Sequence, residues 1–301
     1  NVMQIQQLLH LCSISSKESA KDESVEETSE EQKDDSKPES NESSNEDYRG
    51  FAVLGVALIS SGEEVGTEMA LRLMNHLMYY GNAATKRAVP LALALSSASN
   101  PQVPVIDVLS KYSHDGDKQI ALSAMLALGI VCAGIGNSRI GNLLRALANF
   151  YYKDQLFLSA VKVSQGILHA SRGLYTLHPL SHYRTLMDCA SMSSLLTYLV
   201  CLGDSEDMLF SRYPYLHYLA MCAMTPRYLS TVDSSGTPVK VMVRLGTAVD
   251  TVGLAGTPKT ISAFQTHSTP VLVGCGERAE LARGITERES GFSGNWQPIS
   301  S

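Results

Sequence analysis

The residues best suited to metal chemistry in this sequence are two histidines and a cysteine. His178 and His182 lie four positions apart in the segment His-Pro-Leu-Ser-His, and Cys189 follows them. A zinc ion needs three or four converging protein ligands, which usually come in tight pairs. The sequence offers no second pair, and Pro179 argues against one continuous helix face for both histidines. We therefore expect no metal site.

Nucleotide and nucleophile chemistry also lack the residues that they need. The stretch Gly134-Ile-Gly-Asn-Ser-Arg139 has arginine where a dinucleotide-binding motif requires its third glycine, and it follows helical sequence. The chain has no GxxxxGK(S/T) motif for phosphates. It also has no GxSxG elbow for a serine nucleophile. The sequence therefore predicts a protein without a cofactor that is not an enzyme.

Charge is distributed unevenly along the 301 residues. The chain carries a formal net charge of −6, whereas residues 17–47 hold thirteen acids and four lysines, a net of −9, so the remainder carries +3. Such a small excess gives no basic footprint for nucleic acid. The longest uncharged apolar run, residues 120–136, is shorter than the ~20 residues that span a bilayer. We expect neither nucleic acid nor a membrane as a partner.

Composition divides the chain into five segments. Residues 1–15 predict a helix that continues a repeat lying upstream. Residues 16–47 are rich in Ser, Glu, Asp and Lys and predict a disordered acidic insertion, because they have too little apolar surface to bury. Residues 48–226 predict helical repeats and residues 227–281 a small β domain. Residues 282–301 form an atypical polar tail.

A register of 36 residues dominates the helical segment. Four alanines recur at this interval, and a small residue stands ten positions after each of them. On a helix, both positions lie near one face, where small side chains let neighbouring helices approach closely. We interpret Gly55, Gly129 and Gly166 in the same way, since glycine inside a helix otherwise costs ~1 kcal/mol relative to alanine. The eight repeat positions are Ala52, Gly62, Ala88, Ala98, Ala124, Gly134, Ala160 and Ala170.

A second, more polar helix follows each of these segments, at residues 68–80, 105–112 and 139–152. A helical pair that repeats at this interval is typical of an α-solenoid, in which stacking covers the apolar face of each pair. The register weakens after Gly173, although residues 184–202 and 214–224 still predict helices.

From Arg227 the apolar period changes to two, which predicts strands at residues 228–232, 239–245 and 269–273. We therefore expect a mostly α chain that ends in a small β domain.

Two groups of motifs resemble the proteasome/cyclosome-repeat family. The helical motifs are Phe51-Ala-Val-Leu-Gly-Val-Ala-Leu-Ile-Ser-Ser-Gly-Glu-Glu-Val-Gly and Arg87-Ala-Val-Pro-Leu-Ala-Leu-Ala-Leu, followed by Ser99-Asn-Pro. The β motifs are Pro258-Lys-Thr-Ile, Phe264-Gln-Thr-His-Ser-Thr-Pro-Val-Leu and Gly276-Glu-Arg-Ala-Glu-Leu281. The likeness extends from Val2 to about Leu281.

The resemblance implies a closed toroid of paired helices, completed upstream of Asn1, and a non-catalytic scaffold in the base of the proteasome regulatory particle, in cytoplasm and nucleus. The expected partners are ATPase subunits with their coiled coil, other base subunits, ubiquitin, ubiquitin-like shuttle proteins and a deubiquitinase. The family's ubiquitin-binding helices lie largely in earlier repeats, so no such residue is assigned here. The family also has a further strand after Leu281, where this sequence is polar, so we expect an open sheet edge.

Two alternatives remain open from the sequence. One is a general helical-repeat adaptor in transport or the cyclosome, which would share the solenoid without requiring the β domain. The other is a hydrolase within the β domain, for which the sequence offers no nucleophile motif.

Overall fold

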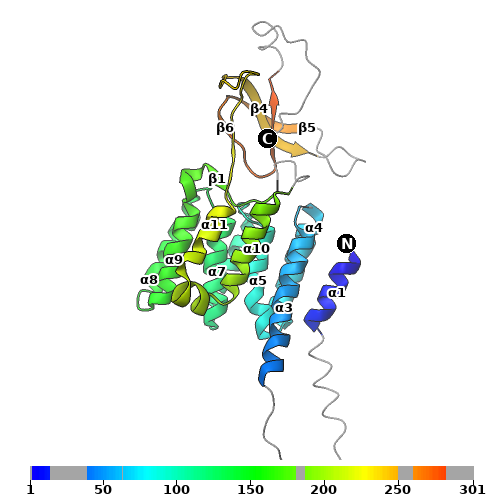
Figure 1. Cartoon of the computed structure of the whole chain (residues 1–301), viewed down its shortest axis with the longest axis vertical. Helices are drawn as coiled ribbons and strands as arrows, with labels where there is room; N and C mark the ends of the chain where they lie inside the picture. Colours follow the sequence, from blue (N-terminus) through cyan, green and yellow to red (C-terminus); the bar gives the residue numbers. More distant parts are fainter. Residues whose placement is uncertain (1, 14–38, 63, 181–186, 250–259, 283–301) are drawn as a thin grey trace, which may run out of the picture.

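The computed structural model describes residues 2–13, 39–62, 64–180, 187–249 and 260–282. Most of these residues form a stack of helical pairs. The first helix of each pair packs against the first helix of the next pair (Figure 1). The helix α1 (Val2–Ser13) packs on α3 (Glu39–Ser60), which is the first helix of the first pair. The first helices are α3 (Glu39–Ser60), α5 (Ala83–Ser96), α7 (Lys118–Val131) and α9 (Gln155–Leu168), and the second helices are α4 (Glu64–Tyr80), α6 (Val103–Tyr112) and α8 (Ser138–Phe150).

The core of the stack lies along α7. The Asp117 side chain caps this helix by accepting a hydrogen bond from the Gln119 amide at 3.0 Å. Every residue from Ile120 to Val131 is buried. A third group of helices, beginning with α10 (Cys189–Gly203), packs against α5 and α7. Of the uncharged run at residues 120–136, residues 120–134 are therefore part of the core. No described helix is long and apolar enough to cross a membrane. The group continues with η2 (Ser205–Arg212), η3 (Pro214–Tyr218) and α11 (Leu219–Cys222).

A small β region lies beyond one end of the helices (Figure 1). Its main sheet has the order β5-β4-β7, with both neighbours antiparallel to β4. Opposite Gly246 the β4–β5 register shifts and Ala263 has a φ of 51°, which marks a β-bulge. The strands are β1 (Tyr175–Thr176), β2 (Thr225–Pro226), β3 (Tyr228–Leu229), β4 (Met242–Val249), β5 (Thr260–Ser268), β6 (Val271–Leu272) and β7 (Glu277–Leu281).

The solenoid of helical pairs and the small β region that the sequence predicts are confirmed, while the closed ring and the domain boundaries stay predictions. The helix α3 begins at Glu39, so residues 39–47 of the segment assigned to the acidic insertion are helical. Acidic residues are favourable near a helix N-terminus, so their presence does not prevent helix formation there. Residues 16–38 and 283–301 lie outside the described residues.

Candidate functional site: the helix seams and the segment that crosses the helix ends

The four repeated alanines lie inside consecutive first helices. Ala52, Ala88, Ala124 and Ala160 belong to α3, α5, α7 and α9 and are at most 7% exposed. At the seam between α3 and α5, the Ala88 Cβ lies 3.7 Å from where a Cβ at Gly50 would stand. Small side chains therefore bring these two helices into close contact.

Gly129 makes the seam between α7 and α9 tighter still. A Cβ at this position would lie 2.9 Å from the Ser164 Cα, closer than real Cβ atoms approach. The Ser164 Oγ donates across the same seam to the Met125 carbonyl oxygen at 2.9 Å. At Gly55, a Cβ would similarly lie 3.2 Å from the Leu8 Cδ1 of α1. The interpretation was wrong for Gly166, which is exposed and whose would-be Cβ has no described atom of another helix within 4 Å.

The small residues ten positions further on lie beyond the helix faces. Gly62, Ala98, Gly134 and Ala170 follow the last residues of α3, α5, α7 and α9, so the prediction of one shared helix face was wrong for them. Gly62 and Gly134 have φ values of +92° and +71°, in the left-handed region that commonly ends helices. Ala170 begins a 3-10 turn, η1 (Ala170–Gly173).

These helix ends accommodate residues 173–180, which include the short strand β1 and which we call the crossing segment. A Cβ at Gly134 would overlap the carbonyl oxygen of Tyr175. The His178 Nδ1 lies 3.2 Å from the Ala98 carbonyl oxygen, and the Leu180 Cδ1 lies 3.2 Å from the would-be Cβ of Gly62. The segment thus passes the carboxyl ends of α7, α5 and α3 in turn, and at α7 Gly134 leaves room for its backbone.

Ser99 fixes the crossing segment to the helix ends. Its Oγ accepts a hydrogen bond from the Leu177 amide at 2.8 Å and donates one to the Ala133 carbonyl oxygen at 3.1 Å. Its own amide donates to the Ile130 carbonyl oxygen, and its φ is 51°. One buried hydroxyl therefore joins α5, α7 and the crossing segment.

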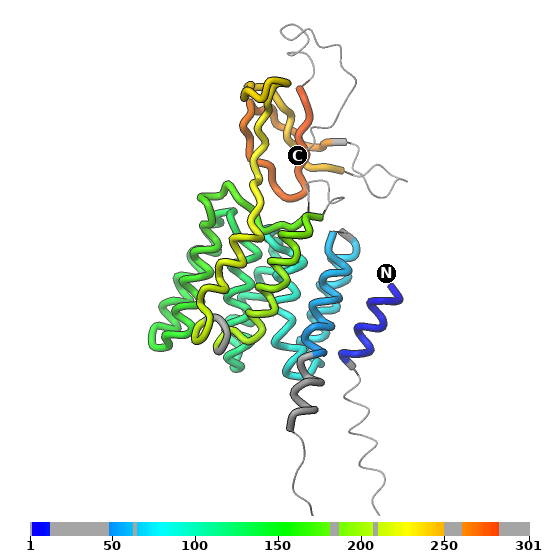
Figure 2. Tube along the Cα trace, viewed as in Figure 1, coloured from blue at the N-terminus to red at the C-terminus, as the bar shows by residue number. Residues whose placement is uncertain are grey.

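The crossing segment also holds the β region. Its strand β1 pairs with β2, and the Arg227 amide donates to the Leu174 carbonyl oxygen at 2.9 Å. The Arg227 carbonyl oxygen in turn accepts from the Val273 amide at 2.8 Å. Figure 2 shows the chain rising from the helices into the β region at this point. Backbone hydrogen bonds thus run from the crossing segment through Arg227 to the chain beside the β3–β6 pair.

Residues that sequence reasoning considered for metal chemistry are not brought together. The His178 ring lies against the end of α5, Cys189 is exposed at the start of α10, and His182 lies outside the described residues. Within the described ranges, no three His, Cys, Asp or Glu side chains are grouped so that they could hold a metal ion.

Burial keeps the interior groups neutral. It raises the pKa of the Cys132 thiol to about 12, so this thiol stays protonated near neutral pH and is a poor nucleophile. Burial also raises the pKa of Tyr198, whose hydroxyl lies 3.1 Å from the His217 Nδ1. The pKa of His217 is lowered, again by burial. The Tyr198 hydroxyl and the His217 ring thus interact with each other, and the Tyr198 side chain is fully buried.

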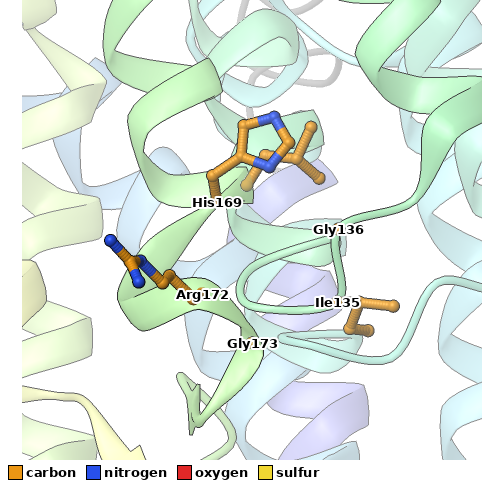
Figure 3. A pocket seen from close by; sticks show the side chains of 6 residues that line it. Ile135, Gly136, His169, Arg172 and Gly173 are labelled. Atoms are coloured by element: carbon orange, nitrogen blue, oxygen red, sulfur yellow. The ribbon is translucent and has the colours of Figure 1, made fainter.

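A shallow hollow of about 290 Å³ lies at the end of α9. Figure 3 shows His169 and Arg172 at this end of the helix and the loop at Ile135 and Gly136 beside them. Leu168 and Gly173 complete the lining. The polar side chains in this lining are those of His169 and Arg172.

Sequence reasoning missed Ser99 and the crossing segment. The segment is too short to show a strand period, and its partners lie up to 80 positions away in the chain. The available signal was the recurrence of small residues just past each helix, which marks places where a backbone can approach closely.

Comparison with known proteins adds an independent line of evidence. A family model described as the 26S proteasome non-ATPase regulatory subunit RPN1 C-terminal region matches residues 252–285. The 26S proteasome non-ATPase regulatory subunit 2 of Dictyostelium discoideum is 44% identical over 282 residues, which cover 94% of this chain and 28% of that protein. The 26S proteasome regulatory subunit rpn-1 of Neurospora crassa is 45% identical over 280 residues, covering 93% and 29%.

The Arabidopsis thaliana protein named 26S proteasome non-ATPase regulatory subunit 2 homolog A is 46% identical over 235 residues, covering 78% of this chain and 26% of that protein. The chain therefore spans somewhat over a quarter of the length of these relatives. Over the matched residues, the chain is homologous to the 26S proteasome non-ATPase regulatory subunits of the Rpn1 family.

Proposed function

We propose that this chain is part of a non-catalytic scaffold in the base of the 26S proteasome regulatory particle. The observation that carries the proposal is the 44% identity to a named regulatory subunit across 94% of the chain. The structure supports it physically, because tightly stacked helices with a sheet fixed at their ends form a rigid platform. Of the residues that we considered for metal chemistry, the described ones, His178 and Cys189, are not grouped with further metal-binding side chains among the described residues.

The partners follow from the same proposal. The scaffold contacts proteasomal ATPase subunits and other base subunits. Through the whole protein it supports docking of ubiquitin or ubiquitin-like shuttle proteins and of a deubiquitinase, and so regulates ubiquitin-dependent degradation. It acts in the cytoplasm and nucleus as part of the proteasome.

Affinity purification of the tagged full-length protein tests this function. Recovery of ATPase subunits together with other base subunits is expected. Recovery of the protein without any proteasome subunit would contradict the proposal.

A general helical-repeat adaptor is the second candidate, because the stacked pairs alone would serve an adaptor. Deleting residues 227–281 from the full-length protein separates the two functions. The proteasome scaffold predicts defective assembly into the base, whereas an adaptor that uses only the helices predicts normal partner binding. If the isolated β region instead hydrolysed generic ester or peptide substrates, the non-catalytic proposal would fail.

A further inference from the structure

The helix α4 has a second apolar stripe that the fold does not use. Its inner face buries Ala70, Met74 and Met78, and the helix packs on α3 and α5. On its outer face Val65, Met69 and Tyr79 are 69%, 66% and 76% exposed, and exposed Arg72 and His76 lie between them. We call these five outer residues the α4 stripe.

The spacing of the α4 stripe is that of a helix–helix seam. Its positions 65, 69, 72, 76 and 79 are separated by four, three, four and three residues, the interval that keeps side chains facing a partner helix in a coiled coil. At 1.5 Å per residue the stripe extends about 21 Å along α4, or two heptads. Three large apolar side chains exposed along such a line are typical of an interaction site.

The second helix α8 shows the usual alternative. Its outer positions Arg139, Asn142, Arg145 and Asn149 are exposed and polar. A polar outer face is what a surface helix of a solenoid needs for solvation. The apolar outer residues of α4 therefore do not follow from the helical-pair architecture.

The charge at the centre of the α4 stripe indicates which kind of partner helix would fit it. Its centre carries Arg72, which forms no ion pair with the other described residues. Beside it is His76, whose ring centroid lies 4.7 Å from that of Tyr80. In an antiparallel pairing of two α4 helices, the Arg72 guanidinium would face its own copy, which is unfavourable. A partner helix with a carboxylate at the centre and apolar side chains toward both ends would match it.

We propose that the α4 stripe docks one amphipathic helix of a partner protein, with apolar side chains at heptad spacing and an Asp or Glu opposite Arg72 and His76. The proposal assigns a surface and a partner chemistry that the proposed scaffold function leaves open. It stands or falls separately from membership of the proteasome base.

Photo-crosslinking in the full-length protein, within the complex that it forms in cells, tests the proposal. A benzophenone amino acid replaces Met69, and the control places it at Asn142 on the polar face of α8. We expect a crosslink from position 69 to a peptide of another protein with apolar residues at three- and four-residue spacing and a central acid, and little from position 142. A crosslink within the same chain, to a second copy, or to a peptide without that pattern would overturn the proposal, as would equal yields at both positions or none.

A charge variant sharpens the result. Arg72→Glu places a carboxylate opposite the partner's acid, so the crosslink yield from position 69 should fall about tenfold, corresponding to ~1.4 kcal/mol. Arg72→Lys keeps the charge and should retain most of the yield. Arg72 is exposed, so both variants should unfold at the parent's temperature. An unchanged yield in Arg72→Glu would contradict the predicted carboxylate.

Discussion

The helical stack and the β region reach stability in different ways. In α7 every residue from Ile120 to Val131 is buried, because helices pack on several sides of it. In β5, by contrast, residues 262–268 are all exposed, and β5 and β7 are both edge strands of a three-stranded sheet. A stack of repeats builds a continuous core, whereas so small a sheet buries too little apolar surface to be stable alone. The β region therefore depends on its attachment to the helix ends.

The strongest test of that attachment is Gly134→Ala. The new Cβ would overlap the Tyr175 carbonyl oxygen at a φ of +71°, so the crossing segment must move. We expect the free energy of unfolding to fall by about 2–5 kcal/mol from steric overlap and left-handed strain combined. Thermal unfolding measures it, with Gly116→Ala as the control, because nothing lies within 4 Å of that position. Equal effects of the two substitutions would show that the helix ends do not constrain the segment.

The substitution Gly246→Ala should destabilise the three-stranded sheet without affecting the helical stack. Here the Cβ would overlap Ile261 and lie 2.7 Å from the Ser262 carbonyl oxygen at the β-bulge. We expect a loss of about 1–3 kcal/mol within the β region. Hydrogen exchange should show lost protection in β4 and β5 while α7 keeps its protection. Equal loss in α7 would mean that the two regions unfold as one unit.

Ser99→Ala tests the hydrogen bonds that join the regions. Removing the Oγ leaves the Leu177 amide and the Ala133 carbonyl oxygen without this partner. A cost of about 1–3 kcal/mol is expected in denaturant unfolding. Ser193→Ala removes an exposed hydroxyl on α10 and should change stability by less than ~0.5 kcal/mol. If the Ser99 variant were as stable as this control, the Ser99 hydroxyl would not stabilise the junction between the helix ends and the crossing segment.

The smallest effect is a pH dependence from the helical side. Because burial lowers the pKa of His217 below its ordinary value of 6.5, the unfolded chain binds a proton more readily than the folded chain. Stability from this group is complete above pH 6.5 and is lost as the pH falls from there through the folded-state pKa. Chemical denaturation of the parent and of His217→Gln between pH 7.5 and pH 5 should show a smaller loss in the variant. Parallel losses would contradict this role of His217.

The sequence predicted the helices well because stacking repeats one pattern. The second helices predicted at residues 68–80, 105–112 and 139–152 correspond to α4, α6 and α8, with small differences at their ends. The small residues past each first helix were wrongly predicted to lie on its face, because positions ten apart share a face only while the helix continues. The ends of α3, α5 and α7 contact the crossing segment, a distant part of the chain that the local pattern of these helices does not reveal.

The β region was harder to predict because its signals are local and interrupted. The strand β5 was missed because the bulge at Ala263 breaks the alternation of its side chains. The strand β7 reads Glu-Arg-Ala-Glu-Leu, a charged sequence that suits an edge and gives little strand signal. The strands predicted at residues 228–232, 239–245 and 269–273 overlap β3, β4 and β6, and each of these predicted segments carries two or more β-branched residues.

The matched pair Gly129→Ala and Gly166→Ala tests most directly whether close approach between helices sets the architecture. The same methyl group is added to two neighbouring helices, at 2.9 Å from Ser164 in one and into open space in the other. Gly129→Ala should lower the free energy of unfolding by about 1–3 kcal/mol, whereas Gly166→Ala should leave it unchanged or raise it by up to ~1 kcal/mol. Equal effects, or a stabilising Gly129→Ala, would contradict the tight seam between α7 and α9.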